Sequence, residues 1–95
     1  MNAIVEQPIE GHAGHKFEVV VTYNGVNKEI TVKVDETVKA LLDLAVQVFG
    51  PIPNPHLLGL FTQDGRELQD SKTLKEEGIR SDDHLLLRPS AVRGG

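Results

Sequence analysis

Two glycines, Gly94 and Gly95, stand last in the sequence of 95 residues, and Arg93 precedes them. Because neither glycine has a side chain, this stretch can lie extended in a narrow slot and present a carboxylate to a reagent. A carboxylate is a poor acyl donor at neutral pH, so we expect Gly95 to be a substrate for activation and not a catalyst. Small residues are also common at frayed ends, so the elements ahead of the pair must decide between the two interpretations.

The other polar residues predict no catalytic or metal centre. The chain has no cysteine, which excludes disulfides, thiolate metal sites and a cysteine nucleophile. His12 and His15 are three residues apart, but Gly11 and Gly14 oppose the helix that would bring them onto one face. No carboxylates have the spacing of a general acid and base pair. We therefore expect a protein that is not an enzyme and that binds no metal or cofactor of its own.

Charge and hydropathy narrow the classes of partner. The formal net charge is -4, which disfavours nucleic acid because phosphate binding needs clustered Lys and Arg. The longest apolar runs are a few residues, too short for a membrane-spanning helix, and the N-terminus lacks the layout of a secretory signal. We expect a cytoplasmic monomer that binds neither nucleic acid nor a membrane.

The first half of the chain predicts an extension, a hairpin and a helix. Residues 1–16 show no sustained periodicity, which predicts a flexible N-terminal extension. Apolar residues alternate over 17–22 and 29–34 on either side of Asn24 and Gly25, a pattern typical of a β-hairpin. The helix begins after Thr37, which can cap it, and its expected apolar stripe is Val38, Leu41, Leu42, Ala45, Val48 and Phe49.

The second half predicts three short strands and one turn of helix. Residues 57–62 form a strand, and a turn at Asp64 and Gly65 leads to a short strand around Glu67 and Leu68. A capping box of Thr73 and Glu76 opens a single helical turn. The last strand covers 84–88. We expect a domain over residues 17–88 and a flexible tail over 89–95 that ends in the glycine pair.

Three segments resemble the ubiquitin-like proteins, in the same order and at nearly the same spacing. They are Asp64–Asp70, Thr73–Ile79 and Asp83–Arg88. The resemblance covers about Phe17 to Gly95 and implies the β-grasp fold. This is an α+β architecture in which one helix packs across a mixed sheet and the first and last strands lie parallel at its centre. It also implies a chain related to ubiquitin but distinct from it.

The resemblance implies what is done to the glycine pair. In such proteins an activating enzyme uses ATP and magnesium to convert the terminal carboxylate, here that of Gly95, to an acyl-adenylate. A conjugating enzyme then joins it to a target protein through an isopeptide or ester bond, and a deconjugating protease can remove it. Where ubiquitin has basic and leucine residues before its glycines, this chain has Pro89, Ser90, Ala91 and Val92. The resemblance assigns recognition by the activating enzyme to Ala91, Val92 and Arg93, so we expect a dedicated activating enzyme.

The family's partner-binding patch maps onto Val20, Gly59, Phe61, Leu86 and Arg88. One residue is inserted near Gln63 relative to ubiquitin, which leaves two registers open for the strand over 57–62. A slip of one residue exchanges the buried and exposed faces of a strand. The alternative to a partner-binding patch is that Leu58 and Leu60 form core and Phe61 covers only an edge.

The sequence also offers lysines that could accept another copy of the modifier, and it leaves two alternative functions open. Lys16 and Lys28 are candidate acceptors for chains of the modifier. Arg66 stands where ubiquitin has its best-known chain-building lysine, and a guanidinium that stays protonated cannot act as an amine nucleophile. The alternatives to a modifier are a sulfur carrier with a C-terminal thiocarboxylate and a docking module that is not conjugated.

Overall fold

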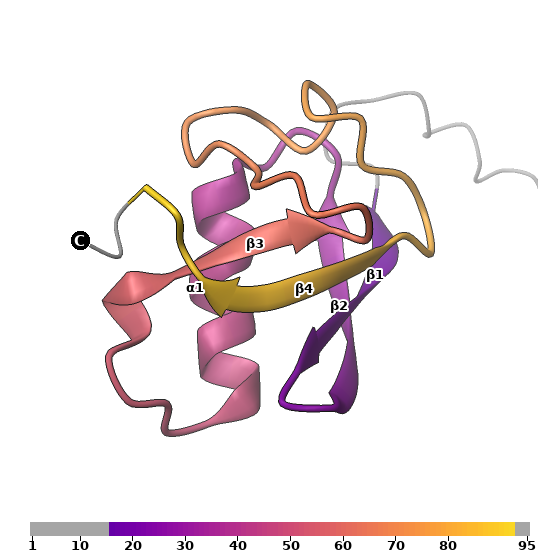
Figure 1. The fold of residues 1–95 in the computed structure, drawn as a ribbon. Helices are drawn as coiled ribbons and strands as arrows, with labels where there is room; N and C mark the ends of the chain where they lie inside the picture. The colour runs from indigo at the N-terminus through magenta and orange to yellow at the C-terminus, as the bar shows by residue number, and fades with distance from the viewer. Residues whose placement is uncertain (1–15, 93–95) are drawn as a thin grey trace, which may run out of the picture.

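The computed structural model describes residues 16–92, in which a four-stranded sheet packs one face against a single helix (Figure 1). No helix in this part of the chain is long and apolar enough to cross a membrane. The elements in chain order are β1 (Lys16–Tyr23), β2 (Val26–Lys33), α1 (Val38–Phe49), η2 (Pro55–Leu57), β3 (Leu58–Thr62) and β4 (His84–Pro89).

The first two strands form the predicted hairpin. Asn24 and Gly25 make its two-residue turn with φ of 52° and 78°, the left-handed conformation that such tight turns require. Tyr23 pairs with Val26 directly across this turn, so β2 begins three residues before the predicted Glu29. The pairing continues to Lys16 and Lys33 at the far end, which places Lys16 inside β1.

The sheet order is β2-β1-β4-β3, and the prediction of two parallel strands at its centre is confirmed. Val21 lies beside Leu85 in the parallel ladder of β1 and β4. The outer strands β2 and β3 each run antiparallel to their inner neighbour. This is the mixed sheet of the β-grasp fold, as the sequence predicts.

Helix α1 has the predicted ends. The Thr37 hydroxyl accepts a hydrogen bond from the Ala40 amide at 3.1 Å, and Gly50 ends the helix with φ of 83°. The predicted stripe is wrong at Val48, which is 39% exposed. Phe49, the last residue of the predicted stripe, does pack against the core and lies edge-on to Tyr23, with ring centroids 5.6 Å apart.

The core lies between α1 and the inner face of the sheet, and the loop between β3 and β4 closes one end of it. Both hydrogen bonds of the predicted capping box form, between Thr73 and Glu76, although the segment is a turn and not a helical turn. The buried cluster consists of Val19, Val21, Ile30, Val32, Val38, Leu41, Leu42, Ala45, Leu58, Leu60, Leu68, Leu74, Ile79, Leu85 and Leu87.

The predicted short strand around Glu67 and Leu68 is wrong. Glu67 makes one isolated bridge to Phe61, and the Leu68 amide donates to the Leu60 carbonyl at 2.8 Å. The Gln69 amide points away from β3, as alternate amides of an antiparallel pair do, and donates to the side chain of Glu77 at 2.6 Å. The segment therefore contacts the edge of β3 through an isolated bridge and does not form a strand.

Candidate functional site: the tail root and the outer face of the sheet

The end of β4 leads into a segment that we call the tail root, residues 89–92. β4 includes Pro89, one residue more than the predicted strand. Arg93, Gly94 and Gly95, which include the predicted acyl donor and one predicted recognition residue, lie outside the described residues. The structure therefore shows the segment that immediately precedes Arg93 and the glycine pair.

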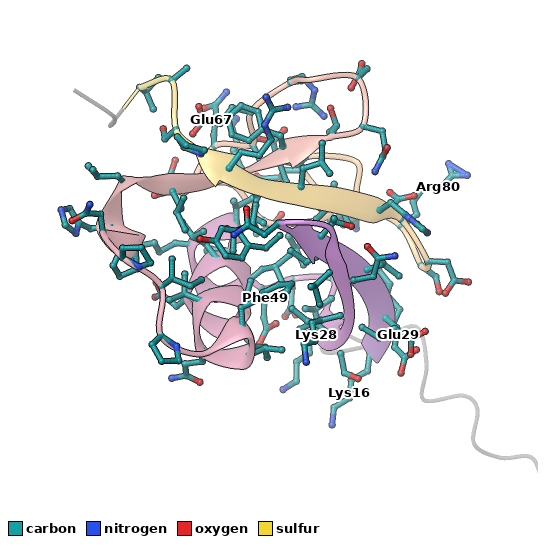
Figure 2. All side chains as sticks on the ribbon, turned by 60° about the horizontal axis from the view of Figure 1, so that its bottom comes forward. Lys16, Lys28, Glu29, Phe49, Glu67 and Arg80 are labelled. Carbon is teal, nitrogen blue, oxygen red and sulfur yellow. The ribbon has the colours of Figure 1, made fainter. Side chains whose placement is uncertain are left out.

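Glu67 holds the tail root against the body of the protein. Its Oε2 accepts a hydrogen bond from the Ser90 hydroxyl at 2.6 Å, and its Oε1 accepts one from the Ala91 amide at 3.0 Å. Figure 2 shows Glu67 beside the C-terminal end of β4. The Ser90 hydroxyl also accepts from the Val92 amide at 3.1 Å. One carboxylate and one hydroxyl thus organise three consecutive residues.

Ser90 is the anchor of this arrangement. It is only 5% exposed, and its amide donates to the Leu57 carbonyl at 2.8 Å. Ala91 and Val92, by contrast, are exposed, and the Val92 side chain retains 79% of its accessible surface. These two predicted recognition residues therefore lie where a partner can contact them.

The face of the sheet that is turned away from α1, which we call the outer face, carries the predicted partner-binding patch. Phe61 pairs with Leu86, and Gly59 pairs with Arg88, across β3 and β4. Val20 lies on the same face of β1, two positions from Thr22, which is the neighbour of Leu86 in the parallel ladder. All five residues of the predicted patch are brought onto one surface.

The register of β3 is the one that puts Leu58 and Leu60 in the core and Gly59 and Phe61 on the outer face. Phe61 is nevertheless only 9% exposed. The Arg88 guanidinium lies 5.7 Å from its ring centroid, within the range of a cation–π contact. The outer face therefore presents a cation over an aromatic ring together with half-buried Val20 and Leu86.

The structural role of Gly59 differs from the predicted direct contact with a partner. It is buried, and a β-carbon added to it would collide with Oε2 of Glu67 and approach Cβ of Ser90. A partner cannot contact it directly without moving these side chains. Gly59 instead makes room for the contact between Glu67 and Ser90.

Arg66 and Glu77 form a second fixed contact near the tail root. Arg66 Nη1 donates to Glu77 Oε1 at 2.7 Å, and the Gln69 amide donates to Glu77 Oε2. Burial of the Glu77 side chain, which is 8% exposed, opposes ionisation. The hydrogen bond from Gln69 and the charge of Arg66 outweigh that burial and lower the pKa of Glu77 below its ordinary value. Arg66, which stands where ubiquitin has a chain-building lysine, thus forms an ion pair with Glu77.

The two candidate acceptor lysines are both exposed on the hairpin, on the β2 and β1 side of the molecule (Figure 2). Lys28 lies in β2 opposite Val21. Lys16 opens β1. Neither has a neighbour that would single it out chemically, and their role as acceptors stays a prediction.

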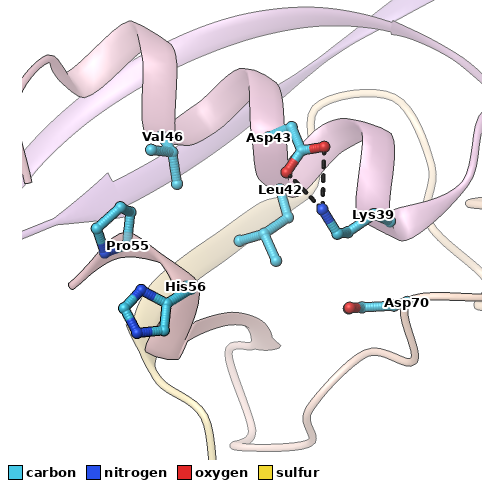
Figure 3. Close-up of a pocket in the computed structure, with 7 residues that line it drawn as sticks. All are labelled: Lys39, Leu42, Asp43, Val46, Pro55, His56 and Asp70. Atoms are coloured by element: carbon cyan, nitrogen blue, oxygen red, sulfur yellow. Dashed lines mark hydrogen bonds and ion pairs between the residues drawn. The ribbon is translucent and has the colours of Figure 1, made fainter. Parts of the chain in front are cut away.

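A groove of about 330 Å³ lies between α1 and the segments around η2 and Asp70 (Figure 3). The Lys39 ammonium on its rim is held by Asp43, with nitrogen–oxygen distances of 2.9 and 3.1 Å. No group of three metal-ligating side chains occurs in residues 16–92. The groove therefore offers no set of three metal ligands. Its lining is Lys39, Leu42, Asp43, Val46, Pro55, His56 and Asp70.

The sequence interpretation missed Glu67 and Ser90. The available signal was Gly59, because a glycine inside a strand often marks the close approach of another group. Neither Glu67 nor Ser90 has a spacing that reveals its partner, since 23 residues separate them. Only the folded sheet brings them together.

Solved structures of ubiquitin-like proteins match this architecture. The chain is similar to a de novo design based on ubiquitin, with a TM-score of 0.69 and 28% identity over 80% of this chain and 90% of that one. It is similar to the UBL domain of Plasmodium falciparum Dsk2, with a TM-score of 0.69 and 19% identity over 80% of this chain and 100% of that domain. It is also similar to an Arabidopsis thaliana protein solved in solution by NMR, with a TM-score of 0.68 and 23% identity over 92% of this chain and 99% of that one.

No protein-family model and no curated protein match the chain. The fold, the parallel central strands and the solved neighbours nevertheless agree. This protein is therefore ubiquitin-like, with the β-grasp fold, and is not ubiquitin itself.

Proposed function

We propose that this protein is a ubiquitin-like modifier: a partner enzyme activates the Gly95 carboxylate, and the acyl group is joined to target proteins. The observation that carries the proposal is the placement of Arg93, Gly94 and Gly95 directly after the tail root of a ubiquitin-like fold. If residues follow Gly95 in the full protein, a protease must remove them first. The protein itself acts as a substrate and a docking partner in this pathway.

The chemistry is an acyl transfer in which this chain supplies the acyl group. The partner enzyme provides ATP and magnesium, and the Gly95 carboxylate oxygen displaces pyrophosphate to form an acyl-adenylate. A thiol then attacks the Gly95 carbonyl carbon, and AMP is the leaving group. This thiol must belong to the partner, because this chain has no cysteine. The glycine pair matters because a β-carbon beside the carbonyl would crowd the attacking atom.

Two surfaces support recognition by the proposed partners. Exposed Ala91 and Val92 lead into Arg93, and we assign these three residues to recognition by the activating enzyme. The outer face, with Phe61, Leu86 and Arg88, is assigned to the conjugating enzyme and the deconjugating protease. We place the pathway in the cytoplasm and expect the free modifier to be a monomer.

Substituting the acyl donor tests the proposal. A tagged chain ending at Gly95 is expressed in its own cells, and products of higher mass that survive boiling and reduction are detected through the tag. Wild type forms such products in an ATP-dependent manner, and Gly95→Val abolishes them because its branched side chain blocks attack at the carbonyl. Gln47→Ala, on the exposed side of α1, serves as the matched control and conjugates like wild type. Normal conjugation by Gly95→Val would overturn the proposal.

A docking module that is not conjugated is the second candidate. The likeness to the UBL domain of Dsk2 favours it, because the chain covers that whole domain. In this case a variant lacking Gly94 and Gly95 still captures the same partner without covalent products. The same experiment also reports a sulfur carrier, because the intact mass of the purified protein would then show one sulfur in place of one oxygen.

A further inference from the structure

We propose that Glu67 is a positioning residue that latches the tail root to the sheet, and that this latch must open before Gly95 can enter an activating enzyme deeply. The latch is the set of contacts among Glu67, Ser90, Ala91 and Gly59. Its existence is independent of the function proposed above, whereas its effect on activation rests on that function.

The contacts of the latch use both oxygens of one carboxylate. Oε2 of Glu67 takes the Ser90 hydroxyl at 2.6 Å, and Oε1 takes the Ala91 amide at 3.0 Å. Hydrogen bonds to an ionised acceptor are stronger than neutral ones. In a flexible tail the Ser90 hydroxyl and the Ala91 amide would be hydrated by water. The two hydrogen bonds to Glu67 instead fix the direction in which the tail root leaves β4.

The latch lies in a space formed by the end of the sheet, beside Gly59 and Ser90. Among the described residues, Ser90 is the only polar residue that is fully buried. Gly59 leaves the space that the Glu67 carboxylate occupies, and any larger residue there would displace it. Glu67, Leu68, Gln69 and Asp70 also line a small hollow with Val92. The tail root is therefore packed along the segment after the turn at Gly65 and does not simply project from β4.

The latch limits how far Gly95 can reach. Three residues lead from Val92 to the end of Gly95, and three residues extend at most about 10 Å. If the latch opens, the six residues after Pro89 can extend about 20 Å. An active site that lies more than about 10 Å beyond Val92 can be reached only in the open form, so we expect the enzyme to bind that form selectively.

Trypsin tests the latch without any partner enzyme. Trypsin must take residues around Arg93 in extended form to cleave there, whereas cleavage after Arg88 is blocked by Pro89. Cleavage of a transiently opened segment follows the population of the open form. We expect Glu67→Ala to speed loss of the last two residues, measured by intact mass, by about tenfold, and Glu67→Gln by about threefold because it keeps one acceptor.

Two further variants separate the latch from other effects. Gly59→Ala keeps the residue at position 67 and the sequence of the tail, but its β-carbon displaces the Glu67 carboxylate. We therefore expect Gly59→Ala to speed the cleavage as well. Glu29→Gln removes an exposed carboxylate on β2 and leaves the rate unchanged. Internal cleavage is followed in the same samples, and acceleration confined to Arg93 identifies the latch. Equal rates for wild type, Glu67→Ala and Gly59→Ala would overturn it, and so would equal acceleration at all sites.

A conjugation assay in cell extract tests the consequence for activation. Opening the latch raises the fraction of molecules that are competent to bind, so the apparent affinity improves by that fraction. We expect Glu67→Gln to lower the modifier concentration for half-maximal product formation about threefold while the maximal rate stays the same. A lowered maximal rate, or no change in a protein whose latch trypsin shows to be open, contradicts the reach argument. Absence of products from wild type refutes the proposed function and leaves the trypsin result standing.

Discussion

At the scale of single residues, two glutamates tie loops to the body of the protein. Glu67 accepts from Ser90 and Ala91, and Glu77 accepts from Arg66 and Gln69. The sequence could not reveal either role, because each partner stands 8 to 24 residues away and no local pattern links them. The same residues are abundant on any protein surface. Their function depends on distances that only the fold sets.

Substituting Glu77 tests the second of these contacts. Glu77→Gln replaces a carboxylate oxygen that accepts a hydrogen bond with an amide that donates, and it removes the charge facing Arg66. We expect the free energy of unfolding at pH 7 to fall by about 1–3 kcal/mol, measured by urea denaturation. Glu29→Gln, which changes an exposed carboxylate, should have little effect.

The pH dependence of that difference follows from the lowered pKa of Glu77. The unfolded chain binds a proton at higher pH than the folded one, so the stabilisation is fully present above the unfolded pKa and is lost as pH falls through the folded pKa. Wild type and Glu77→Gln should therefore begin to converge in stability as the pH falls below about 4.3, the ordinary pKa of a glutamate, and should become equal once the pH is below the lower folded pKa. A difference that persists undiminished into acid would show that the charge of Glu77 is not the cause.

At the scale of elements, local signals predicted the structure well and long-range ones did not. The Asn24–Gly25 turn, the Thr37 cap and the Thr73 capping box each depend on residues within four positions, and all three form. The short strand predicted at Glu67 is a single bridge to Phe61, and the hydrogen bond from the Gln69 amide to Glu77, eight positions away, left no local sign in the sequence. The β3 register also stayed open until the sheet decided it, since alternation alone cannot fix which face is buried.

The cap of α1 offers a test at this scale. Thr37→Ala leaves the Ala40 amide without its side-chain acceptor, and helix caps of this kind contribute about 1 kcal/mol. We expect the urea midpoint to fall accordingly, with the denaturant slope unchanged. Thr31→Ala, at an exposed position of β2, is the control and should cost less. Equal losses in both variants would mean that the cap contributes nothing beyond the change of residue type.

At the scale of the whole molecule, the sheet separates stability from recognition by its two faces. Leu85 and Leu86 are adjacent on β4, but Leu85 is 1% exposed in the core and Leu86 is half-buried on the outer face. The β-grasp fold was predictable because element order and strand parity survive small errors in element bounds. The covering of Phe61 by Arg88 was not, since a cation–π contact depends on the final register of two strands.

The same pair of residues provides the test. Leu85→Ala should reduce the free energy of unfolding by about 2–5 kcal/mol, because it leaves a cavity beneath the sheet. Leu86→Ala should cost clearly less stability, yet it should weaken capture of the partner that the proposed function assigns to the outer face. Urea denaturation and co-purification with the tagged chain measure the two effects. Equal stability losses would contradict the division between faces, and full partner capture by Leu86→Ala would contradict the assignment of the outer face.

The parallel pairing of β1 and β4 has a mechanical consequence. In the proposed conjugate, a force that pulls on the bond at Gly95 enters the fold through β4, and resistance from the other end enters through β1. Because the two strands are parallel neighbours, such a load slides one along the other and stretches together the hydrogen bonds of the ladder that joins residues 20–22 to β4. Bonds loaded together break at a higher force than bonds opened one after another. A conjugate of this protein would therefore withstand traction along its axis, and unfolding by an ATP-driven machine would proceed more easily from a bond to Lys28 on the edge strand β2 than through Gly95.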